Sequence, residues 1–228
     1  MLKRSIVLAT LIVLFTGCAT LNQNKKLPIN EVIKTDVPLQ KKEEQTYLEA
    51  YLDKDKQDTR EHKNFGSFFN KYLNTKIGGD CSGFISVVNK KHENMYFDEK
   101  SISKHYDKSG RKSKAIFNLY SSKKQISFTE PRVGDLIFFA NTLGRAAGKN
   151  KDKSNITHIG IVTEVAKDGT VKFIHNYSGK ITHSYMNLRQ KNTYKIGKKE
   201  INSYMLRCKS NKTSCLASNR FAGYGIVR

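Results

Sequence analysis

The segment Gly78–Phe84 places a cysteine where the surrounding backbone could activate its thiol. Its two glycines permit a tight turn, and Asp80 is a residue type that caps the first turn of a helix. The apolar residues of 84–88 then predict a helix that packs inward. Cys81 would lie in the first turn, where the partial positive charge of the helix N-terminus lowers the pKa of a thiol. The segment therefore predicts a nucleophilic cysteine.

Two histidines further along the chain could serve that thiol. His158 opens a strand-like apolar run, and His175 closes another. In the chemistry that these residues allow, Cys81 attacks an amide carbonyl, and His158 takes the thiol proton and passes it to the leaving amine. Water then hydrolyses the thioester. The order of these residues, framed by one helix and two strands, favours catalysis over an ordinary core cysteine and a structural histidine.

Four short blocks extend this pattern into a family resemblance. The blocks, in chain order, are Asp80–Phe84, Arg132–Phe139, His158–Val162 and Phe173–His175. They resemble the signature blocks of the NlpC/P60 cysteine peptidases, which are papain-like cell-wall hydrolases. The resemblance covers roughly residues 65 to 228. The lysine-rich segment of about 90–130 and the tail beyond about 185 depart from the family pattern.

The resemblance implies a fold and a set of site residues. The implied fold is α+β and papain-like, with N-terminal helices and the nucleophile helix packed on an antiparallel sheet. His175 becomes the third catalytic residue, which orients the imidazole of His158. Asp80 and Ser82 face the substrate, and Tyr72 lies where the family places a tyrosine that contacts substrate. The family needs no cofactor.

The hairpin between the two histidine strands poses a geometric problem. A two-residue turn at Asp168-Gly169 would place His175 opposite Val162, and four residues of strand, roughly 13 Å, would then separate it from the level of His158. A bulge or a wider turn around residues 166–170 would restore the contact. Otherwise another side chain must orient the imidazole, and two candidates are available: Asn176 and His183.

The elements that must position these residues follow from apolar periodicity and turn residues. Helices come first and strands after, an order that fits an α+β domain with an antiparallel sheet. The predicted helical segments are 43–74, Cys81 to about Lys91, and Ser113–Ser121. The predicted strands are 136–139, 157–165, 170–177, 180–186 and 222–227, with an exposed loop at 141–155.

The N-terminus has the pattern of an export signal. Lys3 and Arg4 precede the apolar run 6–15, which is too short to span a bilayer. Thr16-Gly17-Cys18 then resembles a bacterial lipobox, in which Cys18 carries the lipid. The alternative is a plain secretory signal that is cut nearby.

This pattern predicts the domain organisation and the location of the protein. Residues 1–17 form a signal peptide, 18–42 a lipid anchor and tether, and 43–228 the catalytic domain with a helical extension. The lipid anchor attaches the protein to the bacterial envelope, and the absence of aspartate after Cys18 suggests the outer membrane facing the periplasm.

The remaining cysteines and the net charge limit which other functions are possible. Of four cysteines, Cys208 and Cys215 could close a short disulfide loop in an oxidising envelope, or stay as two reduced thiols. The spacing of cysteines and histidines is not that of a metal site. The net charge of +21 favours acidic partners, but no nucleic-acid motif accompanies it, and export argues against a nucleic-acid role.

The sequence thus predicts a peptidoglycan hydrolase that cleaves stem peptides by a cysteine–histidine mechanism. The resemblance favours the bond between γ-D-glutamate and a diamino acid. One alternative keeps the nucleophile but cuts another bond, such as the amide between sugar and L-alanine. The other is a lipoprotein that binds wall peptides without catalysis.

Overall fold

The computed structural model describes residues 66–143, 152–206 and 212–227 of the chain. The predicted signal peptide, the lipidated Cys18, the tether and Cys208 lie outside these residues, as does most of the predicted helical segment 43–74. No helix within the described ranges combines the length and apolar content needed to span a membrane.

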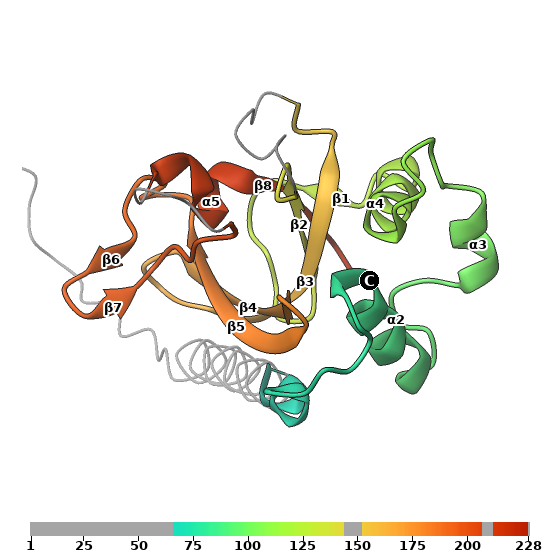
Figure 1. Cartoon of the computed structure of the whole chain (residues 1–228), viewed down its shortest axis with the longest axis horizontal. Coiled ribbons are helices and arrows are strands. Elements are labelled where there is room, and N and C mark those ends of the chain that lie inside the picture. Colours follow the sequence, from blue (N-terminus) through green and yellow to red (C-terminus); the bar gives the residue numbers. More distant parts are fainter. Residues whose placement is uncertain (1–65, 144–151, 207–211, 228) are drawn as a thin grey trace, which may run out of the picture. The chain divides into compact units, whose positions relative to one another are not determined.

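A six-stranded antiparallel sheet forms the centre of the described domain, with strand order β1-β8-β2-β3-β4-β5 (Figure 1). Two further strands, β6 (Lys195–Ile196) and β7 (Lys199–Glu200), pair with each other. The strands of the large sheet are β1 (Ile126–Ser127), β2 (Leu136–Ala140), β3 (Ile156–Val165), β4 (Thr170–Tyr177), β5 (Lys180–Asn187) and β8 (Phe221–Gly225).

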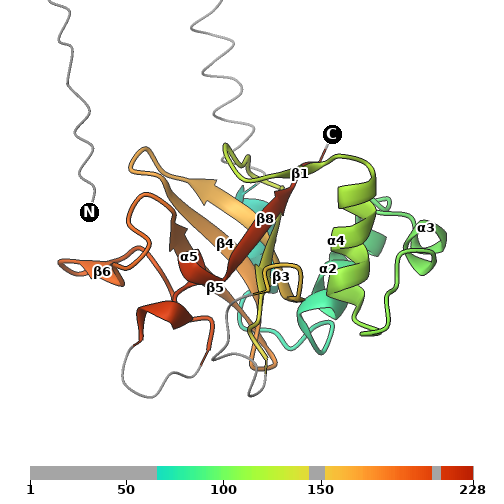
Figure 2. The ribbon, with the colours of Figure 1, turned by 90° about the horizontal axis from the view of Figure 1, so that it is seen from above.

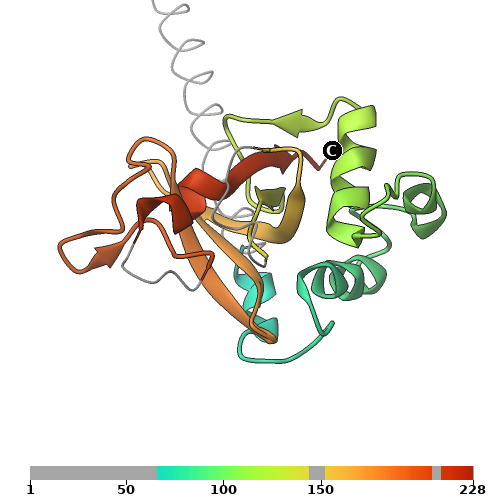
Figure 3. The ribbon, with the colours of Figure 1, turned by 45° about the horizontal axis from the view of Figure 1, so that its top comes forward.

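The helices lie on opposite sides of this sheet. Helices α2 (Cys81–Lys91), α3 (Glu99–Ser103) and α4 (Lys112–Ser122) gather on one side, whereas α5 (Ala217–Arg220) and the β6–β7 pair lie on the other. Figure 2 and Figure 3 show the same arrangement from two further directions. Two short 3-10 helices complete the described elements: η1 (Phe69–Tyr72) and η3 (Thr213–Cys215).

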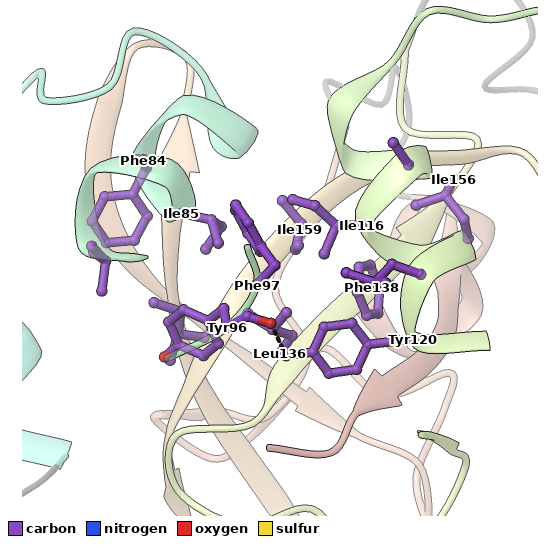
Figure 4. Packing of buried hydrophobic residues seen from close by; sticks show 14 of the residues in the cluster. Phe84, Ile85, Tyr96, Phe97, Ile116, Tyr120, Leu136, Phe138, Ile156 and Ile159 are labelled. Carbon is purple, nitrogen blue, oxygen red and sulfur yellow. Dashed lines mark hydrogen bonds between the residues drawn. The ribbon is translucent and has the colours of Figure 1, made fainter. Parts of the chain in front are cut away.

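Each face of the sheet carries its own apolar core. On the helix side, residues of α2 and α4 such as Phe84 and Ile116 pack against Phe138 of β2 and Ile159 of β3 (Figure 4). The opposite face buries a second cluster that includes Phe173. Burial of both faces explains why β2 reads as a continuous apolar run rather than an alternating one.

The predicted α+β fold with an antiparallel sheet is confirmed. The predicted helix beginning at Cys81 and the strands that carry the histidines form within a residue or two of their expected bounds. The basic segment 92–130 holds one more helix than expected, α3, and ends in the short edge strand β1. These elements are only five and two residues long, too short for a periodic pattern to reveal.

The β3–β4 hairpin resolves the register problem by both of the expected means. Its loop has three residues rather than two, because the N–H of Ala166 donates to the carbonyl of Thr170 at 2.9 Å. The pairing shifts again between Val162 and Glu164, so that Ile161 lies opposite Ile174. Extended toward the strand ends, this register sets His175 level with Gly160. The two histidines are thereby brought within reach of each other.

Candidate active site

A capped turn holds Cys81 at the first position of α2. The carboxylate of Asp80 accepts hydrogen bonds from the N–H of Gly83 at 2.6 Å and the hydroxyl of Ser82 at 3.0 Å. The preceding turn folds back on the helix start so closely that a Cβ on Gly83 would collide with the carbonyl of Gly78, whose φ is +80°. The glycines of the motif are therefore needed to bring the turn against the nucleophile helix.

The thiol of Cys81 is partly buried between α2 and β3. Burial raises its pKa to about 11, while a hydrogen bond from the backbone N–H of Ile159 acts in the opposite direction. The carboxylate of Asp80 raises this pKa further, and the N–H of Ser82 lowers it. The lowered pKa expected from the helix N-terminus is therefore wrong for this structure, because burial outweighs the backbone donors. Burial therefore favours the neutral thiol of Cys81.

A chain of buried side chains begins at His158. Nε2 of His158 lies 2.6 Å from Nδ1 of His175, and Nε2 of His175 lies 2.8 Å from the hydroxyl of Ser184 on β5. A Cβ on Gly160 would lie 3.2 Å from the Cβ of His175 and 2.9 Å from the carbonyl oxygen of Ile174. Glycine at this position thus lets the second histidine approach the first.

Both imidazoles are neutral at physiological pH. Burial lowers the pKa of His158 to about 4, although the carboxylate of Asp80 partly offsets this. Burial also lowers the pKa of His175 well below its ordinary value, and the neighbouring His158 and His183 lower it further. Burial therefore favours the neutral thiol and the neutral imidazole in this cavity.

Cys81 and His158 line the same cavity, which has a volume of about 1500 Å³. The cavity lies where the first turns of α2 and α4 meet the ends of β2, β3 and β4. Among the described residues that line it, Asp80 is the single carboxylate, whereas four side chains carry positive charge. These cations are Arg111, Lys112, Lys212 and Arg220. The charges of the lining therefore favour a ligand that carries negative charge.

The predicted substrate-binding residues divide into two groups. Asp80 and Ser82 line the cavity. Tyr72 does not: its ring packs edge-on against Phe84 in the core, and its hydroxyl lies 3.4 Å from Nε2 of His92. Its role in substrate binding therefore stays a prediction, and the cavity that holds Cys81 does not include its side chain.

The two alternatives for the third catalytic position have other partners. Nε2 of His183 lies 3.2 Å from Oδ1 of Asn70, away from the cavity lining. Asn176 accepts a hydrogen bond from the N–H of Gly179 at 2.9 Å. Of the three candidates, His175 is the one with a hydrogen bond to the ring of His158 in the described structure.

Two residues of the site were not predicted from the sequence. Ser184 extends the histidine chain, and Arg220 lines the cavity from the tail of the chain. Asn176 was predicted only as an alternative orienting residue, and its amide nitrogen has no hydrogen-bond partner among the described residues. No motif marks Ser184 or Arg220. Ser184 could have been found only from the β4–β5 register, and Arg220 only from the tertiary fold.

Within the residues described, no group of three or more histidine, cysteine or acidic side chains could hold a metal ion. Cys215 is disulfide-bonded and lines the cavity. Its predicted partner, Cys208, lies outside the described residues, so the pairing remains a prediction.

Comparison with known proteins identifies one match. A sequence model of the NlpC/P60 family matches residues 66–198, more than half of the chain. This range contains Cys81, the two predicted catalytic histidines and Ser184, and it ends before η3, α5 and β8. Neither the curated proteins nor the solved structures contain a match.

Proposed function

Because the chain belongs to the NlpC/P60 family, whose members are cell-wall peptidases, we propose that it is a peptidoglycan endopeptidase that cleaves the γ-D-glutamyl–diamino acid bond. The observation that carries the proposal is the buried series His158–His175–Ser184, whose first member lines the same cavity as the thiol of Cys81. The charged residues that line this cavity are four cations and one carboxylate. The family fixes the class of substrate and an extracytoplasmic site of action. The choice of bond rests on the resemblance.

The hydrogen-bond series favours one arrangement of protons. If His158 is to accept the thiol proton on Nδ1, its own proton must sit on Nε2 and be donated to Nδ1 of His175. His175 then carries its proton on Nε2, which donates to the hydroxyl of Ser184. This arrangement leaves the base ready, and the same contacts hold once His158 becomes an imidazolium.

Catalysis then proceeds by general base and general acid steps at His158. Nδ1 accepts the proton as the sulfur of Cys81 attacks the amide carbonyl, and returns it to the nitrogen of the leaving amine as the C–N bond breaks. Water attacks the resulting thioester, its proton goes to the same nitrogen, and the thiolate leaves and regains the proton.

Two donors could stabilise the oxyanion that forms on the carbonyl. One is the backbone N–H of Cys81 at the helix start. The other is Nδ2 of Asn176, which is buried without a hydrogen-bond partner in the described part of the chain. The β3–β4 register sets Asn176 level with Ile159, whose N–H contacts the sulfur. Asn176→Ala should therefore lower kcat by about 10²-fold with little change in KM.

The test of the proposed function is mass spectrometry of purified peptidoglycan after digestion. Products that end in γ-D-glutamate, with new amino termini on the diamino acid, support the proposal. Release of intact stem peptides from the sugar would favour the amidase alternative. Absence of cleavage with retained wall binding would favour a non-catalytic wall-binding lipoprotein. Cys81→Ala is the matched control for each measurement.

We also propose the envelope attachment expected from the N-terminal sequence. Cys18 would carry a lipid after removal of residues 1–17, and residues 18–42 would tether the catalytic domain, with the outer membrane facing the periplasm as the location. The support is the lipobox-like sequence ahead of a domain whose family acts outside the cytoplasm. Wild-type protein should partition into detergent and carry an acyl mass, and Cys18→Ser should lose both.

A further inference from the structure

The guanidinium of Arg220 is a buried cation without a negatively charged partner in the described part of the chain. The residue is 0 % exposed, yet it lines the cavity that holds Cys81. Nε donates to the carbonyl of Ser214 at 2.6 Å, and Nη1 donates to the carbonyl of Asn141 at 3.0 Å. Nη2 finds no hydrogen-bond acceptor among the described residues. Burial lowers the pKa of this group, and no nearby carboxylate opposes the shift.

Such an arrangement is unfavourable in a free protein. A buried charge is ordinarily paired, and a buried N–H ordinarily finds an acceptor. The two backbone carbonyls fix the plane of the guanidinium and leave Nη2 for a further group. An arginine fork held in this way suits a carboxylate, which can accept two N–H groups side by side. A bound anion would therefore supply both the missing acceptor for Nη2 and the missing negative charge.

The sheet register places this cation at a defined position relative to the catalytic residues. Phe139 of β2 lies opposite His158 on one side and Phe221 of β8 on the other. Arg220 immediately precedes Phe221, so it begins about two strand spacings, roughly 10 Å, from the row of His158. Asn176 lies on β4, on the other side of β3. A peptide that crosses His158 would thus meet Arg220 on one side only.

We propose that Arg220 binds a carboxylate of the stem peptide on the leaving-amine side of the cleaved bond. This inference rests on the proposed function and specifies its substrate: if Asp80 and Ser82 face the acyl portion, the diamino acid extends toward Arg220. The free carboxylates of that residue supply the missing anion. Arg111, Lys112 and Lys212 add a positive field that draws the ligand in, while Arg220 provides the directional contact.

Binding measurements on an inactive protein test this site apart from turnover. Calorimetric titration of the Cys81→Ala protein would compare L-alanyl-γ-D-glutamyl-diaminopimelate with the analogue whose two diaminopimelate carboxylates are carboxamides. We expect the carboxylate form to bind about 10- to 100-fold more tightly, which is the range for a hydrogen bond to a charged group. Adding Arg220→Gln should close this gap to within about threefold, and Arg220→Lys should retain part of it.

Arg111→Gln is the matched control, because it removes a charge from the cavity without removing the buried fork. It should leave most of the discrimination in place. Equal affinity for the two ligands, absence of binding to both, or a gap that persists in folded Arg220→Gln would overturn the proposal. Should Arg220→Gln fail to fold, the comparison of the two ligands on the parent protein still decides. Loss of the proposed wall-cleavage products with the gap intact would refute the assigned bond and leave the carboxylate site standing.

Discussion

The hydroxyl of Ser184 is a positioning group, and its removal should damage turnover without touching the substrate. Ser184 is buried on β5, accepts the proton of His175 Nε2 in the productive arrangement, and does not line the cavity. Ser184→Ala would leave that N–H buried without an acceptor. His175 could then escape the penalty by moving its proton to Nδ1, which faces His158. The proton of His158 would be forced onto its own Nδ1, and the base would be blocked.

The size of this effect follows from the two positions that the His175 proton can take in the Ser184→Ala protein. With the proton on Nε2, a buried N–H without an acceptor costs about 1–3 kcal/mol. With the proton on Nδ1, Nε2 is an acceptor without a donor, which costs less. A difference of about 1–2 kcal/mol in favour of the unproductive arrangement corresponds to a fall in kcat of about 5- to 30-fold. KM should stay within about twofold, because Ser184 makes no contact with the cavity.

Steady-state hydrolysis of a synthetic stem peptide measures both constants. Ser184→Thr keeps the hydroxyl and should recover most of kcat, whereas Ser184→Val keeps the approximate volume of threonine and should not. Thermal unfolding of each variant separates lost stability from lost turnover. A kcat for Ser184→Ala within about twofold of wild type, or a fall expressed in KM instead, would refute the reasoning.

Four further predictions concern the same site. Cys81→Ala should reduce wall hydrolysis to background, whereas His175→Ala should keep its fold and lose about 10²-fold in rate; full turnover without the thiol would contradict the mechanism. Alkylation of Cys81 by iodoacetamide should rise about tenfold per pH unit between about pH 6 and about pH 9, because its pKa is raised to about 11, and a plateau near pH 6 would show a preformed thiolate instead. The unfolding temperature should fall as the pH drops from about 6.5 toward about 4, because the unfolded chain protonates His158 before the folded one does, with its pKa of about 4; His158→Gln should reduce that fall, and an equal fall in both proteins would count against it. Gly160→Ala should cost about 1–3 kcal/mol of stability and most of the activity, since its Cβ would press on the carbonyl of Ile174 and on His175, and wild-type behaviour in unfolding and hydrolysis would disprove this close approach.

The parts of the site that the sequence predicted are those governed by local rules. A glycine turn, a capping aspartate and an apolar run specify the start of α2, so the position of Cys81 follows from neighbours within a few residues. The pairing of the histidines needed one non-local quantity, the hairpin register. Turn chemistry alone suggested a two-residue loop, and the observed three-residue loop plus the later shift changed the pairing by two positions. Each one-residue shift turns a side chain to the opposite face, so the two shifts together keep His175 on its face and bring it two residues, roughly 7 Å, closer to the level of His158.

The pKa of Cys81 could not be predicted from the sequence for a different reason. A helix N-terminus and nearby N–H groups are visible in the sequence, and both favour a thiolate. The desolvation that opposes them depends on how closely β3 packs against the first turn of α2, which no local pattern encodes. The same burial lowers the pKa of His158, so both partners are pushed toward their neutral forms together. A general-base mechanism, rather than a preformed ion pair, is the chemistry that this packing favours.

The position of Arg220 in the cavity wall could not be predicted from the sequence. This residue lies in the tail, after the last residue that the family model matches, and nothing in its neighbours predicts burial of a charged side chain. Its position comes from β8, which inserts between β1 and β2 and so carries the preceding residue to the cavity wall. The matched region contains the predicted catalytic residues, whereas Arg220 lies in the tail. If Arg220 binds the substrate carboxylate as we propose, its variants should change which peptides are cut while the chemistry at Cys81 and His158 persists.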